Sequence, residues 1–134
     1  MSIISESLLF EEQTGIPLPE EFIELYQEKG NGGFGPDYGF LGIVSGHKTD
    51  LGDSILELYK SFRSSSEDDP KWYWPESYIP FIHIACAIHY CIDVASNNYA
   101  VIEFDPTDYD LEVGPKPHFK ILSSSFKEWV AENA

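Results

Sequence analysis

The chain has 134 residues, a length typical of one domain, which buries roughly two-thirds of the surface that its unfolded chain exposes. Apolar residues make up 43% and aromatic residues 15% of the sequence, enough for a hydrophobic core, and this excludes wholesale disorder. Eight Lys and Arg against 23 Asp and Glu give a net charge of −15, which disfavours nucleic acids and anionic membranes as partners. We therefore expect a single domain over residues 1–134 that binds neither.

The sequence is typical of a cytoplasmic protein. It contains no apolar run long enough for a membrane span, and its first residues lack the basic start and cleavage site of a signal peptide. The only cysteines, Cys86 and Cys91, are five positions apart and are interpreted as two thiols in a reducing compartment.

Two helices are predicted at the start of the chain. Residues 3–12 have helical spacing, with an inner face of Ile4, Leu8 and Phe10. A second helix begins near Pro19, which suits a first helical turn, and ends at Gly30. Its inner face consists of Phe22, Leu25 and Tyr26.

The outer face of this second helix carries one carboxylate per turn, from Glu20, Glu24 and Glu28. Like charges at this spacing cost a few tenths of a kcal/mol each, and Glu28 also lies at the unfavourable end of the helix dipole. The stripe is either a solvated face or a docking surface for a basic partner.

The segment Gly30–Pro36 is predicted to be a turn. It follows a helix and lacks lysine, whereas phosphate-binding loops follow a strand, lead into a helix and carry one. A strand is predicted next, at 38–44, followed by a helix at 54–63 that begins with a capping box of Ser54 and Glu57.

The second half of the chain is rich in strands, predicted at 80–86, 88–94, 99–104 and 118–122. A last helix begins with a capping box of Ser125 and Glu128. This order predicts an α+β fold, in which an antiparallel sheet of about five to six strands packs with N-terminal, middle and C-terminal helices.

Alternation of apolar residues predicts a hairpin in which Val94 pairs with Ala100, Ile92 with Ile102 and Tyr90 with Phe104. Asn98 would take the left-handed conformation in its loop.

The other face of this hairpin would bring together Cys91, His89 and Asp105, the outline of a Cys–His–Asp catalytic set. Glu103 beside Cys91 would raise the pKa of the thiol, which opposes activation. A small Cys-dependent hydrolase is therefore a remote alternative, and we assign no catalytic residue.

Residues 67–112 carry ten acidic residues against Lys71 alone. Together with the helix stripe, this acidic block supplies the candidate partner-binding residues: Glu67, Asp68, Asp69, Trp72, Trp74, Asp108, Asp110, Glu24 and Glu28. Aromatic residues beside acids can anchor a protein interface, although Trp72 and Trp74 can equally be structural lids over the sheet.

The loop 105–112 contains four carboxylates but lacks the ligand alternation and central glycine of an EF-hand, so weak Ca²⁺ binding there stays open. The scattered histidines have no metal-ligand spacing, and we expect neither a metal site nor a cofactor.

One pattern extends over much of the chain: Ile16-Pro17-Leu18-Pro19-Glu20-Glu21-Phe22, then Gly30-Asn31-Gly32-Gly33, then the strands around Pro80–Ala85, Tyr90–Asp93 and Val101–Asp105, and last Ser125-Phe126-Lys127-Glu128-Trp129. This pattern resembles that of the SUKH superfamily of Smi/Knr-like domains. It extends over about 16–130.

This resemblance implies an α+β fold without catalytic residues. Bacterial members are mostly immunity proteins that bind and neutralise a cognate toxin, often a nuclease, and fungal relatives regulate cell-wall synthesis. It therefore implies a non-enzymatic protein-binding module whose partner is a basic toxin domain, with a regulatory scaffold as the alternative. We expect a monomer or weak homodimer.

Overall fold

The computed structural model describes residues 2–36, 38–68, 74–85, 88–105, 109–110, 114–115 and 118–134. In chain order the elements are α1 (Ile3–Thr14), α2 (Glu20–Lys29), α3 (Ile55–Asp68), β1 (Tyr78–Ala85), β2 (Ile88–Asp93), β3 (Val101–Asp105), β4 (Tyr109–Asp110), β5 (Gly114–Pro115), β6 (His118–Ser123) and α4 (Phe126–Asn133). The fold is α+β, as predicted.

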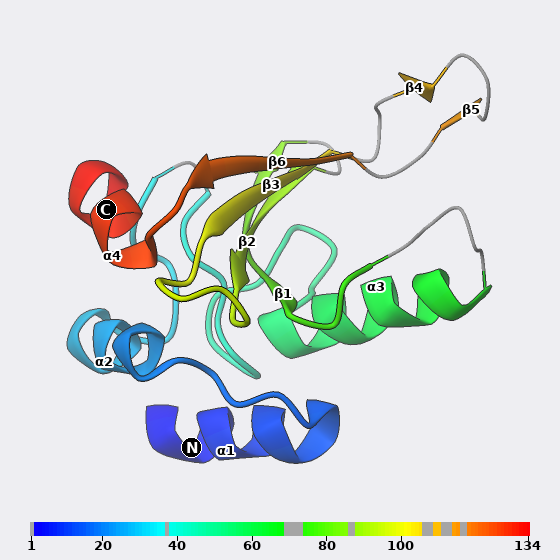
Figure 1. Ribbon diagram of the computed structural model, residues 1–134. Helices are drawn as coiled ribbons and strands as arrows, with labels where there is room; N and C mark the ends of the chain where they lie inside the picture. Colours follow the sequence, from blue (N-terminus) through cyan, green and yellow to red (C-terminus); the bar gives the residue numbers. More distant parts are fainter. Residues whose placement is uncertain are drawn as a thin grey trace.

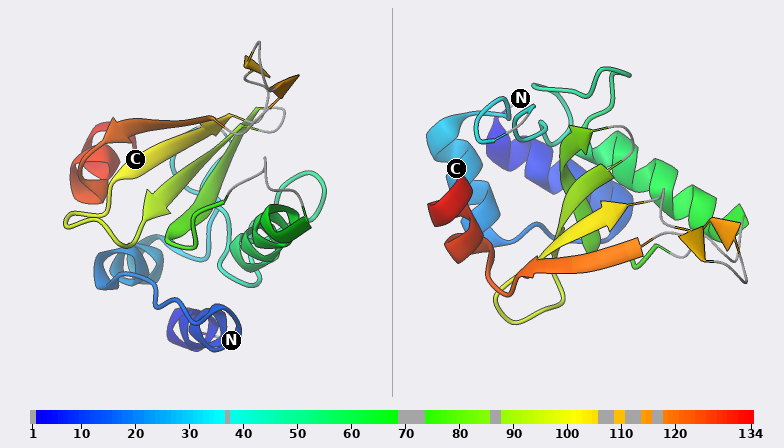
Figure 2. Two further views of the ribbon diagram at one scale, coloured as in Figure 1. Left: turned by 45° about the vertical axis from the view of Figure 1, so that its right-hand side comes forward. Right: turned by 90° about the horizontal axis from the view of Figure 1, so that it is seen from above.

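The main sheet is antiparallel and has four strands in the order β1-β2-β3-β6, while β4 and β5 pair with each other. The prediction of five to six strands in one sheet was therefore slightly high. Figure 1 shows α1 and α2 below one end of the sheet, α4 close to α2, and α3 running beside β1. Figure 2 shows the same arrangement from two other directions.

Local signals in the sequence explain the ends of the helices. Ser54 and Glu57 form the predicted capping box at the start of α3, where each backbone N–H donates to the other's side chain at 3.3 Å. At α4, the Ser125 hydroxyl accepts from the Glu128 N–H at 3.3 Å. The N–H of Gly30 closes α2 on the Tyr26 carbonyl at 2.8 Å.

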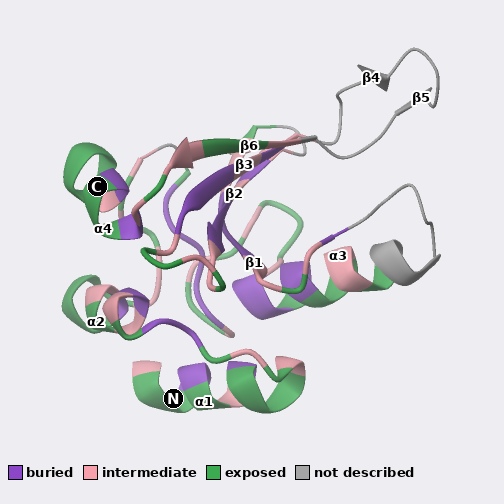
Figure 3. Ribbon diagram, viewed as in Figure 1, coloured by how far each residue is buried: buried purple, intermediate pink, exposed green. Residues whose placement is uncertain are grey.

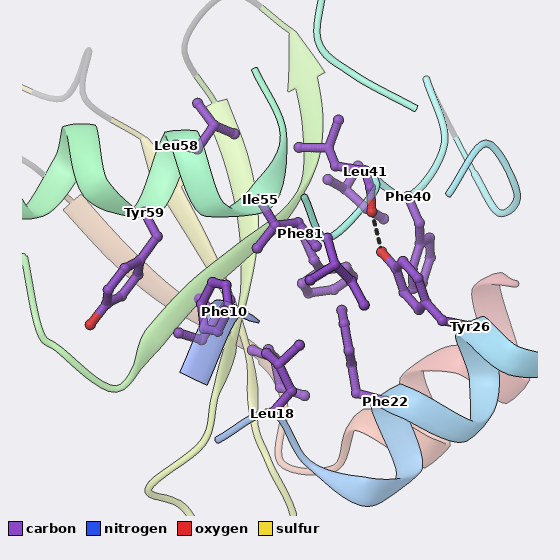
Figure 4. Close-up of a cluster of buried hydrophobic side chains, with 14 of the residues drawn as sticks. Phe10, Leu18, Phe22, Tyr26, Phe40, Leu41, Ile55, Leu58, Tyr59 and Phe81 are labelled. Carbon is purple, nitrogen blue, oxygen red and sulfur yellow. Dashed lines mark hydrogen bonds between the residues drawn. The ribbon is translucent and has the colours of Figure 1, made fainter. Parts of the chain in front are cut away.

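The core lies on both faces of the sheet. One cluster joins β1, β2 and β3 to all four helices, with Phe22, Phe81 and Phe126 fully buried or nearly so. Figure 4 shows part of this cluster, in which the hydroxyl of Tyr26 donates to the carbonyl of Leu41. A second cluster, on the opposite face, consists of Trp74, Cys91, Ala100, Ile102 and Phe104.

The predicted hairpin register is wrong by one residue. Ile92 pairs with Val101, Cys91 with Ile102, and Tyr90 with Glu103. Because both faces of these strands are covered, apolar residues occur at odd and even positions, and alternation cannot fix the register. The left-handed residue of the loop is Tyr99, with φ 57°, rather than Asn98.

The predicted strand at 38–44 is also wrong. Phe40 forms one isolated bridge with Ile82, and the segment otherwise belongs to a loop rich in glycine. Two glycines are required by close backbone approach: a Cβ on Gly32 would lie 2.6 Å from the Phe40 carbonyl oxygen, and one on Gly42 would lie 1.7 Å from that of Ser45. The glycines thus serve packing within the loop, consistent with the predicted turn.

Helix α1 is rotated relative to the prediction. Ile4 and Leu8 are 46% and 61% exposed, whereas Glu6, Ser7 and Phe10 are buried. Figure 3 shows α1 with a narrow buried side toward the core and a largely exposed outer side. The packed face of α1 contains Ile3, Ser7 and Phe10 at helical spacing. The side chain of Glu6 is buried on the same face.

Candidate protein-binding surfaces

The predicted partner-binding residues fall on three parts of the chain. Glu24 and Glu28 are exposed on α2, Glu67 and Asp68 belong to the last turn of α3, and Asp110 belongs to β4. Asp69, Trp72 and Asp108 lie outside the described residues.

Trp74 cannot contact a partner as the partner-binding prediction required, because its side chain is completely buried. Its ring contacts those of Phe62 and Phe104, with centroids 4.5 and 4.8 Å away, and its Nε1–H donates to the Tyr78 carbonyl at 2.9 Å. The alternative interpretation, a structural lid over the sheet, is the one that the packing supports.

The acidic stripe on α2 is exposed, as the sequence indicates for Glu20, Glu24 and Glu28. A shallow hollow of about 200 Å³ separates α2 from α4, and Glu24 and Glu28 line it together with apolar Leu25 and Val130. This surface combines carboxylates with an apolar floor, which suits long basic side chains with aliphatic stems.

An ion pair between described residues partly neutralises the same hollow. Lys127 Nζ lies 3.5 Å from Glu21 Oε2, and the lysine side chain is 76% exposed. Glu21 Oε1 is buried and has no hydrogen-bond partner. A buried acceptor without a partner is unfavourable, so this carboxylate oxygen costs stability.

Glu6 organises the glycine-rich loop that contains Val44 and Ser45, and this role was not predicted from the sequence. Its carboxylate accepts from the N–H groups of Val44 and Ser45 at 2.8 and 2.7 Å, from the Ser45 hydroxyl at 2.7 Å, and from Asn31 Nδ2 at 2.9 Å. Burial alone would raise the pKa of Glu6, but these hydrogen bonds lower it overall. The helical spacing of Ile3, Ser7 and Phe10 was the available sequence signal, since Glu6 lies on that face.

The Cys–His–Asp outline is not formed. Cys91 faces Ile102 across the hairpin and is fully buried, so burial raises the pKa of its thiol well above the ordinary value. His89 pairs with Phe104, so the next residue, Asp105, lies on the opposite face of the sheet from His89. A buried protonated thiol is a poor nucleophile, so the geometry gives no support to a Cys91-dependent hydrolase.

Within the described residues, no group of three or more His, Cys, Asp or Glu side chains is arranged to hold a metal ion. The helices in the same part of the chain include none with the length and apolar character needed to cross a membrane.

These features define an α+β protein with an exposed acidic stripe on α2. The chain matches the model of the SMI1 / KNR4 family (SUKH-1) over residues 6–132 and belongs to that family. Membership supports a protein-binding role of the immunity-protein or cell-wall-regulator type. No curated protein and no solved structure matches the chain.

Proposed function

We propose that the protein is a cytosolic immunity protein that binds and neutralises a basic toxin domain of the nuclease type. The observation that carries this proposal is the charge: −15 on a chain of a protein-binding family. A nuclease must present positive potential to its phosphodiester substrate, so an acidic inhibitor is steered toward it and opposes that potential.

The acidic block of residues 67–112 and the α2 stripe are the proposed contact surfaces. Changing Glu67 and Asp68 to lysine, or Asp108 and Asp110 to lysine, should slow association strongly, because rim charges act mainly on the association rate. The matched control reverses two exposed acids of α1, Glu11 and Glu12. An association rate equal to that of the control would place the interface elsewhere.

Affinity purification from the native cell, with mass spectrometry as readout, tests the function itself. We expect one basic protein with a nuclease-like domain, released at high salt because screening removes the attraction. The purified protein should then inhibit that nuclease at equimolar amounts. Recovery of a basic nuclease whose activity the protein leaves unchanged would refute neutralisation.

A regulatory scaffold is the second candidate, since the family also includes cell-wall regulators. In that case the bait would recover a cytosolic or cell-envelope regulator, and the nuclease would be absent from the eluate. The same purification therefore separates the two functions.

A further inference from the structure

A groove of about 680 Å³ opens between the loop that precedes α3, α3 itself, and the ends of β1 and β2. It is more than three times as voluminous as the hollow between α2 and α4, at about 200 Å³. The described residues that line it include none of those predicted from the sequence as partner-binding. Figures 1 and 2 show the loop beside the N-terminal half of α3.

One wall of the groove is a row of four rings. Tyr38 stacks on His83 with centroids 5.9 Å apart, and His83 meets His89 at 4.9 Å. Phe62 then meets His89 edge-on at 5.3 Å. Tyr38, at the outer end of the row, is 60% exposed and offers an accessible aromatic face.

Leu51 also lines the groove and is 91% exposed. The turn that carries it is tightly closed: Gly52 N–H donates to the Thr49 carbonyl at 2.8 Å, and Asp53 N–H donates to Thr49 Oγ1 at 3.1 Å. A large apolar side chain on an ordered turn loses little entropy when it is buried, which is a property of interface anchors.

The charge of the groove favours a cationic side chain as its ligand. Asp50 and Asp53 flank Leu51, and no lysine or arginine is among the described residues that line the groove. The nearby Lys48 pairs with Glu57 at 3.7 Å. Carboxylates that share a groove with aromatic rings favour a guanidinium, which stacks on rings and binds carboxylates in a bidentate manner.

We propose that this groove receives an arginine side chain, with an adjacent apolar residue, from the basic protein partner. The inference rests on the proposed function for the identity of that partner. The guanidinium lies against Tyr38 and binds the Asp50 and Asp53 carboxylates, while the apolar neighbour packs on Leu51.

A peptide titration followed by NMR tests the groove without the partner. The probes are three acetylated, amidated heptapeptides with Leu-Arg-Leu, Leu-Lys-Leu or Leu-Glu-Leu at their centre. We expect the arginine peptide to shift the amides of residues 49–53 and the imidazoles of His83 and His89, the lysine peptide to do so more weakly, and the glutamate peptide not at all. Equal shifts with all three peptides, or shifts confined to α2, would overturn the proposal.

Variants at the rim test the same surface. Leu51→Ser, and Asp50→Asn with Asp53→Asn, should each weaken binding of the arginine peptide about tenfold, the scale of an interface anchor. Glu11→Gln with Glu12→Gln changes the charge by the same amount as the double aspartate variant and should leave peptide binding unchanged. Equal losses in both double variants would contradict a specific site.

Binding of the Leu51→Ser variant to the partner recovered by affinity purification distinguishes a failure of the groove proposal from a failure of the proposed immunity function. If Leu51→Ser binds that basic partner as tightly as the unaltered protein does, the groove is not the contact site, and the immunity function stands. If the arginine peptide binds the groove and no basic partner is recovered, the groove is a binding site and the immunity function fails.

Discussion

At the scale of single residues, Glu6 links α1 to the glycine-rich loop through four hydrogen bonds. Replacing it with glutamine removes the charge and turns one acceptor into a donor that faces other donors. We expect Glu6→Gln to lower the free energy of unfolding by about 2–3 kcal/mol near neutral pH, as for a lost charged hydrogen-bond network. Urea unfolding measures the difference.

The pH dependence of this loss follows from the lowered pKa of Glu6. A carboxyl whose pKa is lower in the folded state contributes stability above its unfolded pKa and loses it as the pH falls through the folded value. The difference between Glu6→Gln and the unaltered protein should therefore shrink in acid. Glu11→Gln, on the exposed side of the same helix, is the control, and an equal loss there would contradict the role of Glu6.

Tyr26 makes a second buried contact of this kind, from its hydroxyl to the Leu41 carbonyl (Figure 4). Tyr26→Phe leaves that carbonyl without its donor, and we expect a loss of about 1–3 kcal/mol in the free energy of unfolding. Tyr38→Phe, at an exposed ring, should change stability by less than about 0.5 kcal/mol. Equal effects of the two substitutions in urea unfolding would show that the Tyr26 hydrogen bond contributes nothing.

At the scale of secondary-structure elements, the positions of the helices were predictable because their signals are local, although the packed face of α1 was not. Phe22 and Tyr26 repeat at helical spacing and are buried, and Ser54 caps α3 as predicted. The loop around Phe40 was not predictable, because its conformation depends on Glu6, more than thirty residues earlier in the chain.

The predictions of the hairpin register and of a partner-binding Trp74 were wrong for a related reason. A strand that is buried on both faces shows no alternation of apolar and polar residues. Cys91 and Ile92 are neighbours in the sequence, both apolar and both fully buried, so the pattern cannot tell which of them faces which side. Trp74 follows an acidic segment but packs against Phe104 on a distant strand. The groove beside Leu51 is lined by the loop before α3, by α3 and by the ends of β1 and β2, and only the fold brings the strand ends close to the loop.

The acidic stripe of α2 costs helix stability, and this gives an element-scale prediction with two readouts. Glu28→Lys relieves repulsion with Glu24 and suits the helix dipole, so the free energy of unfolding should rise by about 0.3–1 kcal/mol. Glu12→Lys, in the last turn of α1, should stabilise by a similar mechanism. Thermal or urea unfolding of both variants measures these gains.

The same two variants should differ in partner binding. We expect Glu28→Lys to weaken association with the basic partner about tenfold more than Glu12→Lys, since like charges juxtaposed in an interface cost at least the roughly 1.4 kcal/mol of a tenfold change. Surface plasmon resonance at fixed salt measures both. Stabilisation without any specific loss of binding would show that the α2 stripe is only a solvated face.

At the scale of the whole molecule, the net charge of −15 predicts how salt affects stability. Acidic groups repel one another more in the compact state than in the expanded chain, and salt screens that repulsion. In the described ion pairs, Lys48–Glu57 and Lys127–Glu21, the lysine side chains are 44% and 76% exposed. Exposed pairs contribute little to stability, so their screening by salt offsets the relief of repulsion only weakly. Repulsion should therefore dominate.

We accordingly expect the Tm to rise with sodium chloride up to physiological ionic strength, since about 1 kcal/mol of relieved repulsion corresponds to roughly 3–6 °C for a chain of this size. Potassium chloride should give the same rise, because screening does not depend on the identity of the cation. Glu11→Gln with Glu12→Gln removes two charges and should show a smaller increment with salt. A Tm that falls as salt is added would mean that attractive ion pairs outweigh the repulsion, and the acidic surface would then contribute to the stability of the fold rather than oppose it.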